Sequence, residues 1–314
     1  MSPKRKDKPE SGAAIRDTRR LRTFVFIAIV IVALAAGAGV FYYNTYVAPF
    51  HRVIITVDNQ TVRMDYFLKR IKMSGAEQAQ TLHQVTYEEI VKLLTPQYNI
   101  TASQSDVDEE LKKEAAASSN ITSDSDFAAW YANRLKISGL SDAEYRDIAR
   151  TNLLAERLLE YLAENLPTVA EQAHVYTIIT ATADDALSAT ARVSAGESFS
   201  AVAGEVSLDD STKSKGGELG WLPRGVTPYD DAIFNLAAGQ ISKPVTLDPG
   251  SPDTSQYAIF WVKEFDANRP IDPGPMSVLR SRALYNLIQQ EIPQHVMYTY
   301  SAQDVTWVEN QINK

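Results

Sequence analysis

The sequence predicts an α+β protein behind a single N-terminal transmembrane helix. Three observations predict this fold class. Residues 23–43 form an uncharged apolar run, residues 51–170 carry apolar side chains mostly at helical spacing, and residues 171–268 alternate β-branched runs with short helical patterns. The chain has 314 residues, of which 45% are hydrophobic and 22% are charged. This ordinary globular composition excludes a wholly disordered chain.

Charge is spread unevenly along the chain. The net charge is -8, from 31 basic and 39 acidic residues. Residues 1–22 hold eight basic and three acidic residues, a net charge of +5, which leaves -13 for the remainder. Nucleic acids require a basic binding surface, so we expect no nucleic-acid partner. Cysteine is absent, which excludes disulfides, thiolate metal sites and a cysteine nucleophile.

Residues 23–43 are the predicted transmembrane helix, and residues 1–22 the predicted cytoplasmic tail. A helix of this length extends about 31 Å, close to the hydrocarbon thickness of a bilayer. Basic residues before a span remain in the cytoplasm. We therefore expect a single-pass protein of the cell membrane, with residues 44–314 outside the cytoplasm. A cleaved signal peptide is the alternative, because Ala33-Leu34-Ala35 resembles a cleavage site.

Residues 51–170 predict a mostly helical domain that opens with two short strands. Val53–Val57 is β-branched and precedes the turn residues Asp58-Asn59-Gln60. Helical spacing then continues to Pro167, and the polar composition between Ala115 and Ser125 predicts a linker. Apolar helical stripes of this kind form a core more often than a ligand groove. The helices are expected over residues 64–71, 76–94, from 105 onward, 127–139 and 141–166.

Residues 171–268 predict the element order β-α-α-β-α-β-β. The strands are expected at 174–179, 218–222, 243–245 and 257–262, and the helices at 184–195, 199–206 and 228–234. Between the second helix and the second strand, residues 209–217 are polar and predict a flexible segment.

Three motifs in this region resemble the parvulin family of peptidyl-prolyl cis/trans isomerases. They are Ser214–Trp221 (SKGGELGW), Pro228–Phe234 (PYDDAIF) and Gly239–Val245 (GQISKPV). The resemblance covers the predicted domain of residues 171–268 and implies a four-stranded antiparallel sheet with helices. It also implies isomerisation of X–Pro bonds, a reaction that needs no cofactor.

The flanking segments are similar to the chaperone domain of SurA/PrsA-like foldases. The similar parts are the strand–turn–strand–helix at 53–71, the helix start at 139–141 and the helix at 153–166. This resemblance implies that residues 269–314 form a helical segment that packs on the chaperone-like domain of residues 51–170. It implies a membrane-anchored foldase whose partners are unfolded or newly exported polypeptides. A catalytically inactive holdase or assembly factor near the secretion machinery is the alternative.

The resemblance also assigns candidate site residues. It places Leu219, Val226, Tyr229 and Phe234 at positions that line or support the proline pocket, and Asp209 at the central polar position. The two family histidines fall on Thr177 and Ala258. Both members of the histidine pair are therefore replaced, which leaves isomerase activity uncertain.

The histidines that the chain does have are scattered. His51, His83, His174 and His295 have no partner at metal-ligand spacing, so we expect neither a metal nor a cofactor. His174 precedes Thr177 by three residues, and successive side chains of a strand alternate between its two faces. We therefore expect His174 on the opposite face from Thr177, where it cannot replace the missing histidine.

Overall fold

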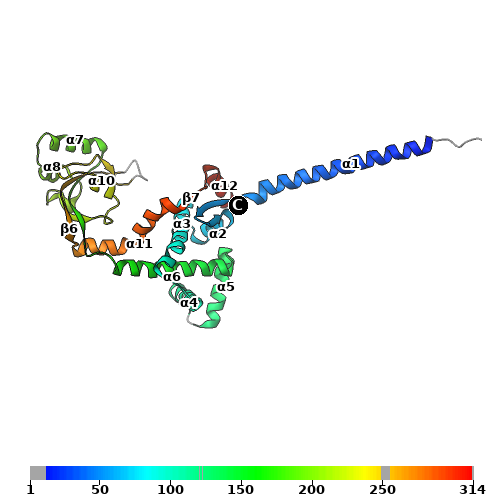
Figure 1. Ribbon diagram of the computed structural model, residues 1–314, viewed down its shortest axis with the longest axis horizontal. Coiled ribbons are helices and arrows are strands. Elements are labelled where there is room, and N and C mark those ends of the chain that lie inside the picture. The colour runs from blue at the N-terminus through cyan, green and yellow to red at the C-terminus, as the bar shows by residue number, and fades with distance from the viewer. Residues whose placement is uncertain (1–11, 120, 122, 249–254, 313–314) are drawn as a thin grey trace, which may run out of the picture. The chain divides into compact units, whose positions relative to one another are not determined.

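The structure, a computed structural model, describes residues 12–119, 121, 123–248 and 255–312. The first eleven residues of the predicted basic tail lie outside this part. The chain divides into two compact units, whose helices and strands are labelled in Figure 1 where there is room. Unit 1 contains residues 1–86, 131–141 and 296–314, and unit 2 contains residues 87–130 and 142–295. The domain boundaries expected from the sequence remain predictions.

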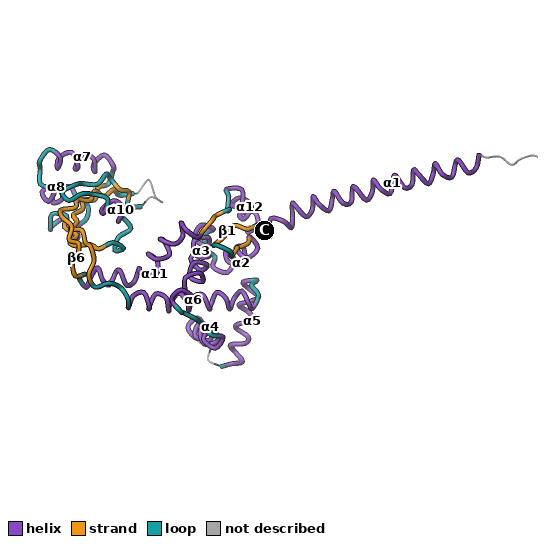
Figure 2. The backbone as a smooth tube through the Cα atoms, in the orientation of Figure 1, coloured by secondary structure: helices purple, strands orange, loops and turns teal. Residues whose placement is uncertain are grey.

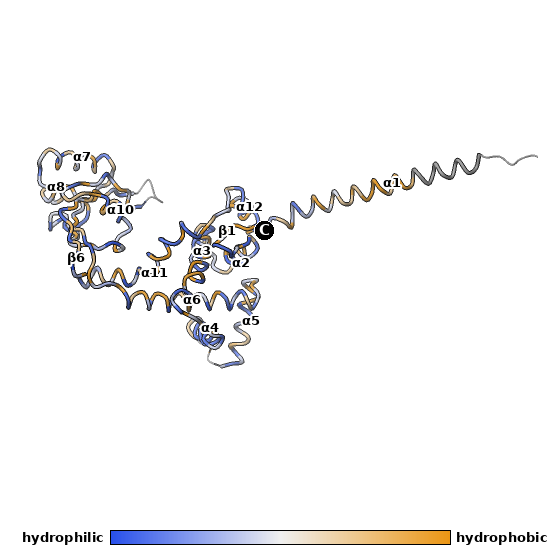
Figure 3. The backbone as a smooth tube through the Cα atoms, viewed as in Figure 1, coloured by the Kyte–Doolittle hydropathy of each residue, from blue (hydrophilic) through white to orange (hydrophobic). Residues whose placement is uncertain are grey.

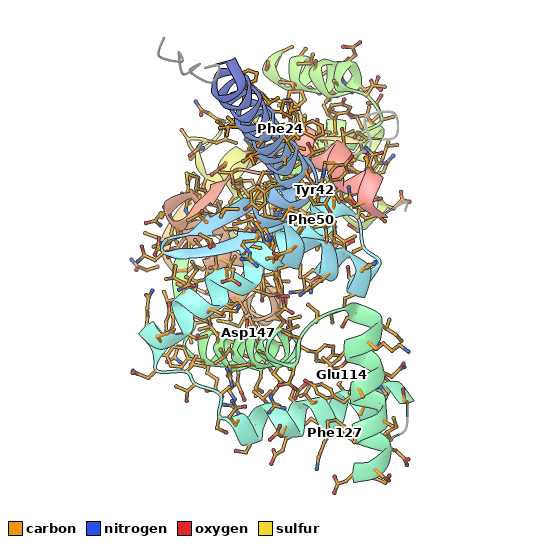
Figure 4. All side chains as sticks on the ribbon, turned by 90° about the vertical axis from the view of Figure 1, so that its right-hand side faces the viewer. Phe24, Tyr42, Phe50, Glu114, Phe127 and Asp147 are labelled. Atoms are coloured by element: carbon orange, nitrogen blue, oxygen red, sulfur yellow. The ribbon has the colours of Figure 1, made fainter. Side chains whose placement is uncertain are left out.

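Unit 1 begins with a long exposed helix. Helix α1 (Gly12–Tyr42) continues through the π-helical turn η1 (Tyr43–Val47) and the 3-10 turn η2 (Ala48–His51). All side chains from Phe24 to Tyr46 are exposed, and the hydrophobic colouring of Figure 3 follows this stretch. Phe24 and Tyr42 are labelled on α1 in Figure 4. The helix is long and apolar enough to cross a membrane.

A three-stranded antiparallel sheet lies directly after this helix. Its strands are β1 (Val53–Val57), β2 (Gln60–Arg63) and β7 (Val296–Tyr298), in the order β2-β1-β7. Strands β1 and β2 form the predicted hairpin, with Val57 opposite Gln60. Strand β7 was not predicted. It joins the other edge of β1, where Val57 pairs with Val296.

Helices α2 and α12 complete the core of unit 1. In α2 (Met64–Ser74), Met64, Phe67 and Ile71 follow helical spacing and are buried. The Phe67 ring lies edge-on to Tyr300, with centroids 5.3 Å apart. Tyr300 precedes α12 (Ala302–Ile312). This C-terminal helix is therefore part of the same core as the N-terminal hairpin.

Helices α3 (Gln78–Leu94) and α5 (Asp124–Ser138) each contain residues of both units, and η3 (Thr95–Tyr98) follows α3. Helix α4 (Gln104–Ser119) continues beyond the point at which the sequence predicted a linker. Val107, Leu111 and Ala115 form one buried stripe of α4, so burial of Ala115 extends the helix. The predicted linker was therefore wrong over residues 115–119, and also over residues 124–125, where α5 begins.

Helices α4, α6 (Asp142–Glu164) and α11 (Pro273–His295) pack together in unit 2, with α6 against both of the others. Polar contacts fix α6. Lys92 Nζ lies 2.5 Å from a carboxylate oxygen of Asp147, and the Tyr145 hydroxyl donates to Glu114 at 2.8 Å. Asp147 and Glu114 are labelled in Figure 4.

Unit 2 also holds a four-stranded antiparallel sheet in the order β4-β3-β6-β5, drawn in orange in Figure 2. This sheet and the surrounding helices confirm the predicted α+β fold class. Its strands are β3 (Val169–Thr180), β4 (Glu218–Pro223), β5 (Val245–Thr246) and β6 (Tyr257–Pro270). Its helices are α7 (Ala183–Ser194), α8 (Phe199–Val206), α9 (Asp210–Lys213) and α10 (Asp230–Phe234).

Candidate functional site

The two faces of the four-stranded sheet pack against different helices. Val175 of β3 and Phe260 of β6 belong to one buried cluster with α10 residues. Ile178 and Ile259 belong to a second cluster with residues of α7 and α8. We call these surfaces the α10 face and the α7/α8 face. The alternation of side chains along β3 and β6 decides which residues reach each face.

Thr177 and Ala258 both lie on the α10 face. Thr177 pairs with Phe260 and is 2% exposed, and Ala258 pairs with Ile179 and is 1% exposed. The Thr177 N–H donates to the Gly217 carbonyl oxygen at 2.8 Å, whereas its buried hydroxyl has no hydrogen-bond partner among the described residues. The two positions that the resemblance assigns to histidines therefore meet on one face. They hold a hydroxyl and a methyl group that do not titrate at neutral pH.

Asp209 caps a short helix instead of lying in a flexible segment. The sequence predicted flexibility over residues 209–217, but α9 forms there because the Asp209 carboxylate accepts local hydrogen bonds. The Ser211 N–H and hydroxyl donate to it at 3.1 and 2.6 Å, and the Thr212 hydroxyl donates at 2.6 Å. Burial disfavours the charged carboxylate, but these hydrogen bonds outweigh it and lower the pKa of Asp209.

The residues just before Asp209 are bonded to β3. The Leu208 N–H donates to the Ile179 carbonyl oxygen at 2.7 Å, and the Ile179 N–H donates to the Ser207 hydroxyl at 3.2 Å. Ile179 is two residues beyond Thr177 on the same strand. Asp209 therefore directly follows a segment that is hydrogen-bonded to β3, the strand that carries Thr177. These bonds give the Asp209 carboxylate a defined position.

Tyr229 and Phe234 come from the segment around α10. The Tyr229 ring lies against Phe260, with centroids 5.6 Å apart, and its hydroxyl donates to the Leu247 carbonyl oxygen at 3.1 Å. Phe234 is 8% exposed, and the Arg224 guanidinium lies 4.2 Å from its ring centroid. Phe234 is therefore a supporting core residue, whereas Tyr229 is only half-buried.

Leu219 and Val226 lie on and after β4. Leu219 is 39% exposed, and Val226 is half-buried in the loop that joins β4 to α10. Leu219 is the only exposed apolar side chain among the seven predicted site residues. An exposed apolar side chain such as Leu219 is a surface that a proline ring can cover.

Sequence analysis missed Phe260, which lies opposite Thr177 and contacts Tyr229. The signal was present, because Phe260 follows Ala258 by two residues and so shares its face. The structure thus brings Thr177, Ala258 and Tyr229 together around Phe260. Their roles toward a substrate, and those of Asp209, remain predictions.

His174 lies away from this site, as its spacing predicted. It is buried, its Nε2 atom is 2.7 Å from Glu218, and its ring stacks on Trp221 with centroids 4.9 Å apart. A second aromatic contact joins it to Tyr176, which packs on the α7/α8 face. His174 therefore binds neighbouring strands together and does not reach Thr177.

No group of three or more His, Cys, Asp or Glu side chains in the described part of the chain is arranged to hold a metal ion. The expectation of a metal-free and cofactor-free protein remains a prediction.

Comparison with known proteins agrees with the motifs. Residues 167–252 match the Rotamase family model, described as a PPIC-type PPIASE domain. A foldase protein PrsA from Caldanaerobacter subterraneus subsp. tengcongensis is 33% identical over 172 residues, covering 54% of this chain and 52% of that protein. A foldase protein PrsA from Streptococcus sanguinis is 26% identical over 226 residues, covering 67% and 63%. The chain thus spans between about half and two thirds of the length of these two relatives.

Among solved structures, the peptidylprolyl isomerase PrsA from Bacillus anthracis aligns with a TM-score of 0.34 and 21% identity, covering 72% of this chain and 94% of that one. The family match and the PrsA relatives confirm the resemblance to parvulin-type isomerases and to this group of foldases.

Proposed function

We propose that this protein is a membrane-anchored, extracytoplasmic foldase that binds unfolded, newly exported polypeptides and weakly catalyses X–Pro isomerisation. One observation carries the proposal. The segment that matches the PPIC-type domain, residues 167–252, supplies Thr177 and Tyr229, which lie around Phe260 of the neighbouring strand β6 on the α10 face. The similarity to PrsA foldases supports a polypeptide as the substrate.

The chemistry requires neither a nucleophile nor a metal. Rotation about an X–Pro bond is slow because the partial double bond imposes a barrier of about 20 kcal/mol. A catalyst must bind the twisted amide more tightly than the planar one. In this proposal Leu219, Val226 and Tyr229 contact the proline ring, and Phe234 supports them from the core. The Asp209 carboxylate supplies a fixed charge near the rotating amide.

Catalysis is expected to be weak because two polar groups are missing. Thr177 and Ala258 are buried and stand where the parvulin resemblance assigns histidines. Asp209 already accepts hydrogen bonds from Ser211 and Thr212, which reduces its capacity to accept another. We expect an acceleration of roughly 10- to 100-fold, equivalent to about 1.4–2.8 kcal/mol of transition-state preference.

The anchor in this proposal is α1, with residues 1–22 in the cytoplasm. The support is the uncharged, fully exposed stretch from residue 24 onward and the basic segment before it. Protease added outside intact spheroplasts should cleave the chain beyond residue 44. Full protection of residues 44–314 would contradict this orientation.

A catalytically inactive holdase is the second candidate. The same replacement of both histidine positions by Thr177 and Ala258 favours it. In that case the proline site and the helical domain bind exposed segments of unfolded chains without accelerating rotation. The two candidates share a location and a class of partner, and they differ only in turnover.

A protease-coupled isomerisation assay on a proline tetrapeptide separates the two candidates, using the full chain in detergent micelles. The foldase proposal expects acceleration that Tyr229→Ala and Asp209→Ala abolish. Leu187→Ala is the matched control, because this exposed side chain of α7 lies outside the site. If the protein shows no acceleration but suppresses aggregation of an unfolded client, it is a holdase. Absence of both effects would refute both candidates.

A further inference from the structure

Helix α11 makes direct contacts with the loop that carries two of the proposed substrate contacts. This loop, residues 224–229, joins β4 to α10 and contains Val226 and Tyr229. Helix α11 (Pro273–His295) begins beyond the end of the family match at residue 252. The helix therefore adds contacts to the site that the matched domain does not contain.

Two side chains of α11 donate hydrogen bonds to consecutive carbonyl groups of the loop. Asn286 Nδ2 donates to the Gly225 carbonyl oxygen at 3.0 Å, and Arg282 Nη1 donates to the Val226 carbonyl oxygen at 3.2 Å. Asn286 and Arg282 are four residues apart and so lie on one face of the helix. One face of α11 thus binds the carbonyl groups of two consecutive peptide units, those that follow Gly225 and Val226.

The loop also packs directly against this helix. A Cβ atom added at Gly225 would lie 2.8 Å from Asn286 Nδ2 and 3.1 Å from a methyl carbon of the buried Leu279. A side chain at this position would require Asn286 to move, and the φ of +91° at Gly225 also favours glycine. The contact is therefore close-packed, and movement of α11 relative to the sheet would displace the loop.

The N–H group of Gly225, which lies in the preceding peptide unit, is bonded to the first residue of α10. The Gly225 N–H donates to Asp230 Oδ2 at 2.5 Å. Burial raises the pKa of the Asp230 carboxyl, against the opposing effect of the Arg224 and Arg282 charges. Gly225 is consequently held at its N–H by α10 and at its carbonyl by α11, and Val226 follows it directly.

We propose that α11 holds the 224–229 loop in its substrate-binding conformation, with Asn286 and Arg282 as positioning residues. Neither side chain needs to touch the substrate, because both act through the backbone that presents Val226 and Tyr229. This proposal rests on the proposed function. It adds that the proline site is complete only when a helix from outside the matched domain is in place.

The test uses hydrogen exchange and peptide kinetics on the full chain in detergent micelles. Asn286→Ala removes one donor, and Arg282→Lys is the conservative variant that keeps a charge and a donor next to Val226. Gln289→Ala is the matched control, since Gln289 is an exposed residue of the same helix. We expect amide exchange in residues 224–230 to accelerate about five- to tenfold in Asn286→Ala. We expect little change in Arg282→Lys and none in Gln289→Ala.

The kinetic readout separates positioning from a general structural role. A displaced loop should raise the KM for a proline tetrapeptide by about threefold or more and leave kcat nearly unchanged. Unchanged loop exchange in Asn286→Ala would overturn the proposal, and so would faster exchange with an unchanged KM in an active protein. If the unmodified chain neither binds nor isomerises the peptide, the proposed function fails. The positioning proposal then fails as well, because there is no substrate site to position. This holds even if loop exchange shows that α11 holds the loop.

Discussion

Replacing Gly217 by alanine should disrupt the strand that carries Thr177, and Gly220 provides a matched control. Both glycines have left-handed backbone angles, with φ of +84° and +90°. This conformation costs a residue with a Cβ about 1–2 kcal/mol. The surroundings differ. At Gly217 the new Cβ would fall well inside van der Waals contact of the Thr177 carbonyl oxygen and 3.0 Å from the Ala203 Cβ, whereas at Gly220 nothing lies within 4 Å.

The steric cost of the new Cβ therefore applies to Gly217→Ala and not to Gly220→Ala. Backbone atoms cannot rotate away, so Gly217→Ala adds an overpacking cost of about 1–3 kcal/mol to the conformational cost. We expect the local free energy of opening of β3 to fall by about 3 kcal/mol or more in Gly217→Ala. In Gly220→Ala we expect a fall of about 1–2 kcal/mol.

Hydrogen exchange of peptides covering residues 172–180 measures this local free energy in the full chain and avoids the assumption that the whole molecule unfolds in one step. Peptides from α4, which is remote in sequence, serve as the internal reference. Equal losses in the two variants would refute the reasoning, because the contact between Gly217 and Thr177 would then contribute nothing beyond backbone strain.

Three further predictions concern single polar groups. Asp209→Asn should remove a pH dependence of the stability of α9. Hydrogen bonds lower the pKa of Asp209 in the folded chain. The contribution of Asp209 to stability is therefore present above about pH 4 and is lost as the pH falls through its folded pKa. Hydrogen exchange of α9 between pH 3 and 6 would detect this, and an equal slope in the variant would contradict it. Burial, together with the Asp304 and Glu309 charges, raises the pKa of Tyr300 to about 12. Its contribution to stability should persist up to about pH 10 and disappear as the pH approaches 12. The difference in absorbance at 295 nm between the unmodified chain and Tyr300→Phe should therefore rise near pH 12 and not near pH 10. Tyr229→Phe keeps the ring but removes the hydroxyl that donates to Leu247; it should cost about 1 kcal/mol of local stability and change tetrapeptide affinity less than twofold, whereas a tenfold loss in a binding titration would show that the hydroxyl contacts the substrate.

Local sequence patterns predicted the sheet of unit 2 well. The period of two predicted that His174 lies on the opposite face of β3 from Thr177, and the structure confirms this. Thr177 and Ala258, which the parvulin resemblance assigned as the histidine positions, lie together on the other face. Such assignments succeed because they depend only on neighbouring residues and on strand geometry.

Features that depend on distant contacts were not predictable. Strand β7 has three residues and follows a helix that contains Pro293, and only its pairing with β1 makes it a strand. The contacts of Asn286 with Gly225 join residues 61 positions apart. No periodicity encodes which loop carbonyl an asparagine on a helix will reach. The length of α4 was underestimated because small residues such as Ala115 are typical of linkers. Only their burial shows that they belong to the helix.

The pairing of β7 with β1 has a consequence for the order of events during synthesis. Val57 and Val296 are partners separated by 239 positions in the chain. At elongation rates of about 5–20 residues per second, the first partner is made on the order of 10–50 s before the second. Throughout that interval the open edge of β1 can pair with any other extended segment. The edge of β1 is therefore open to non-native pairing until Val296 has been synthesised.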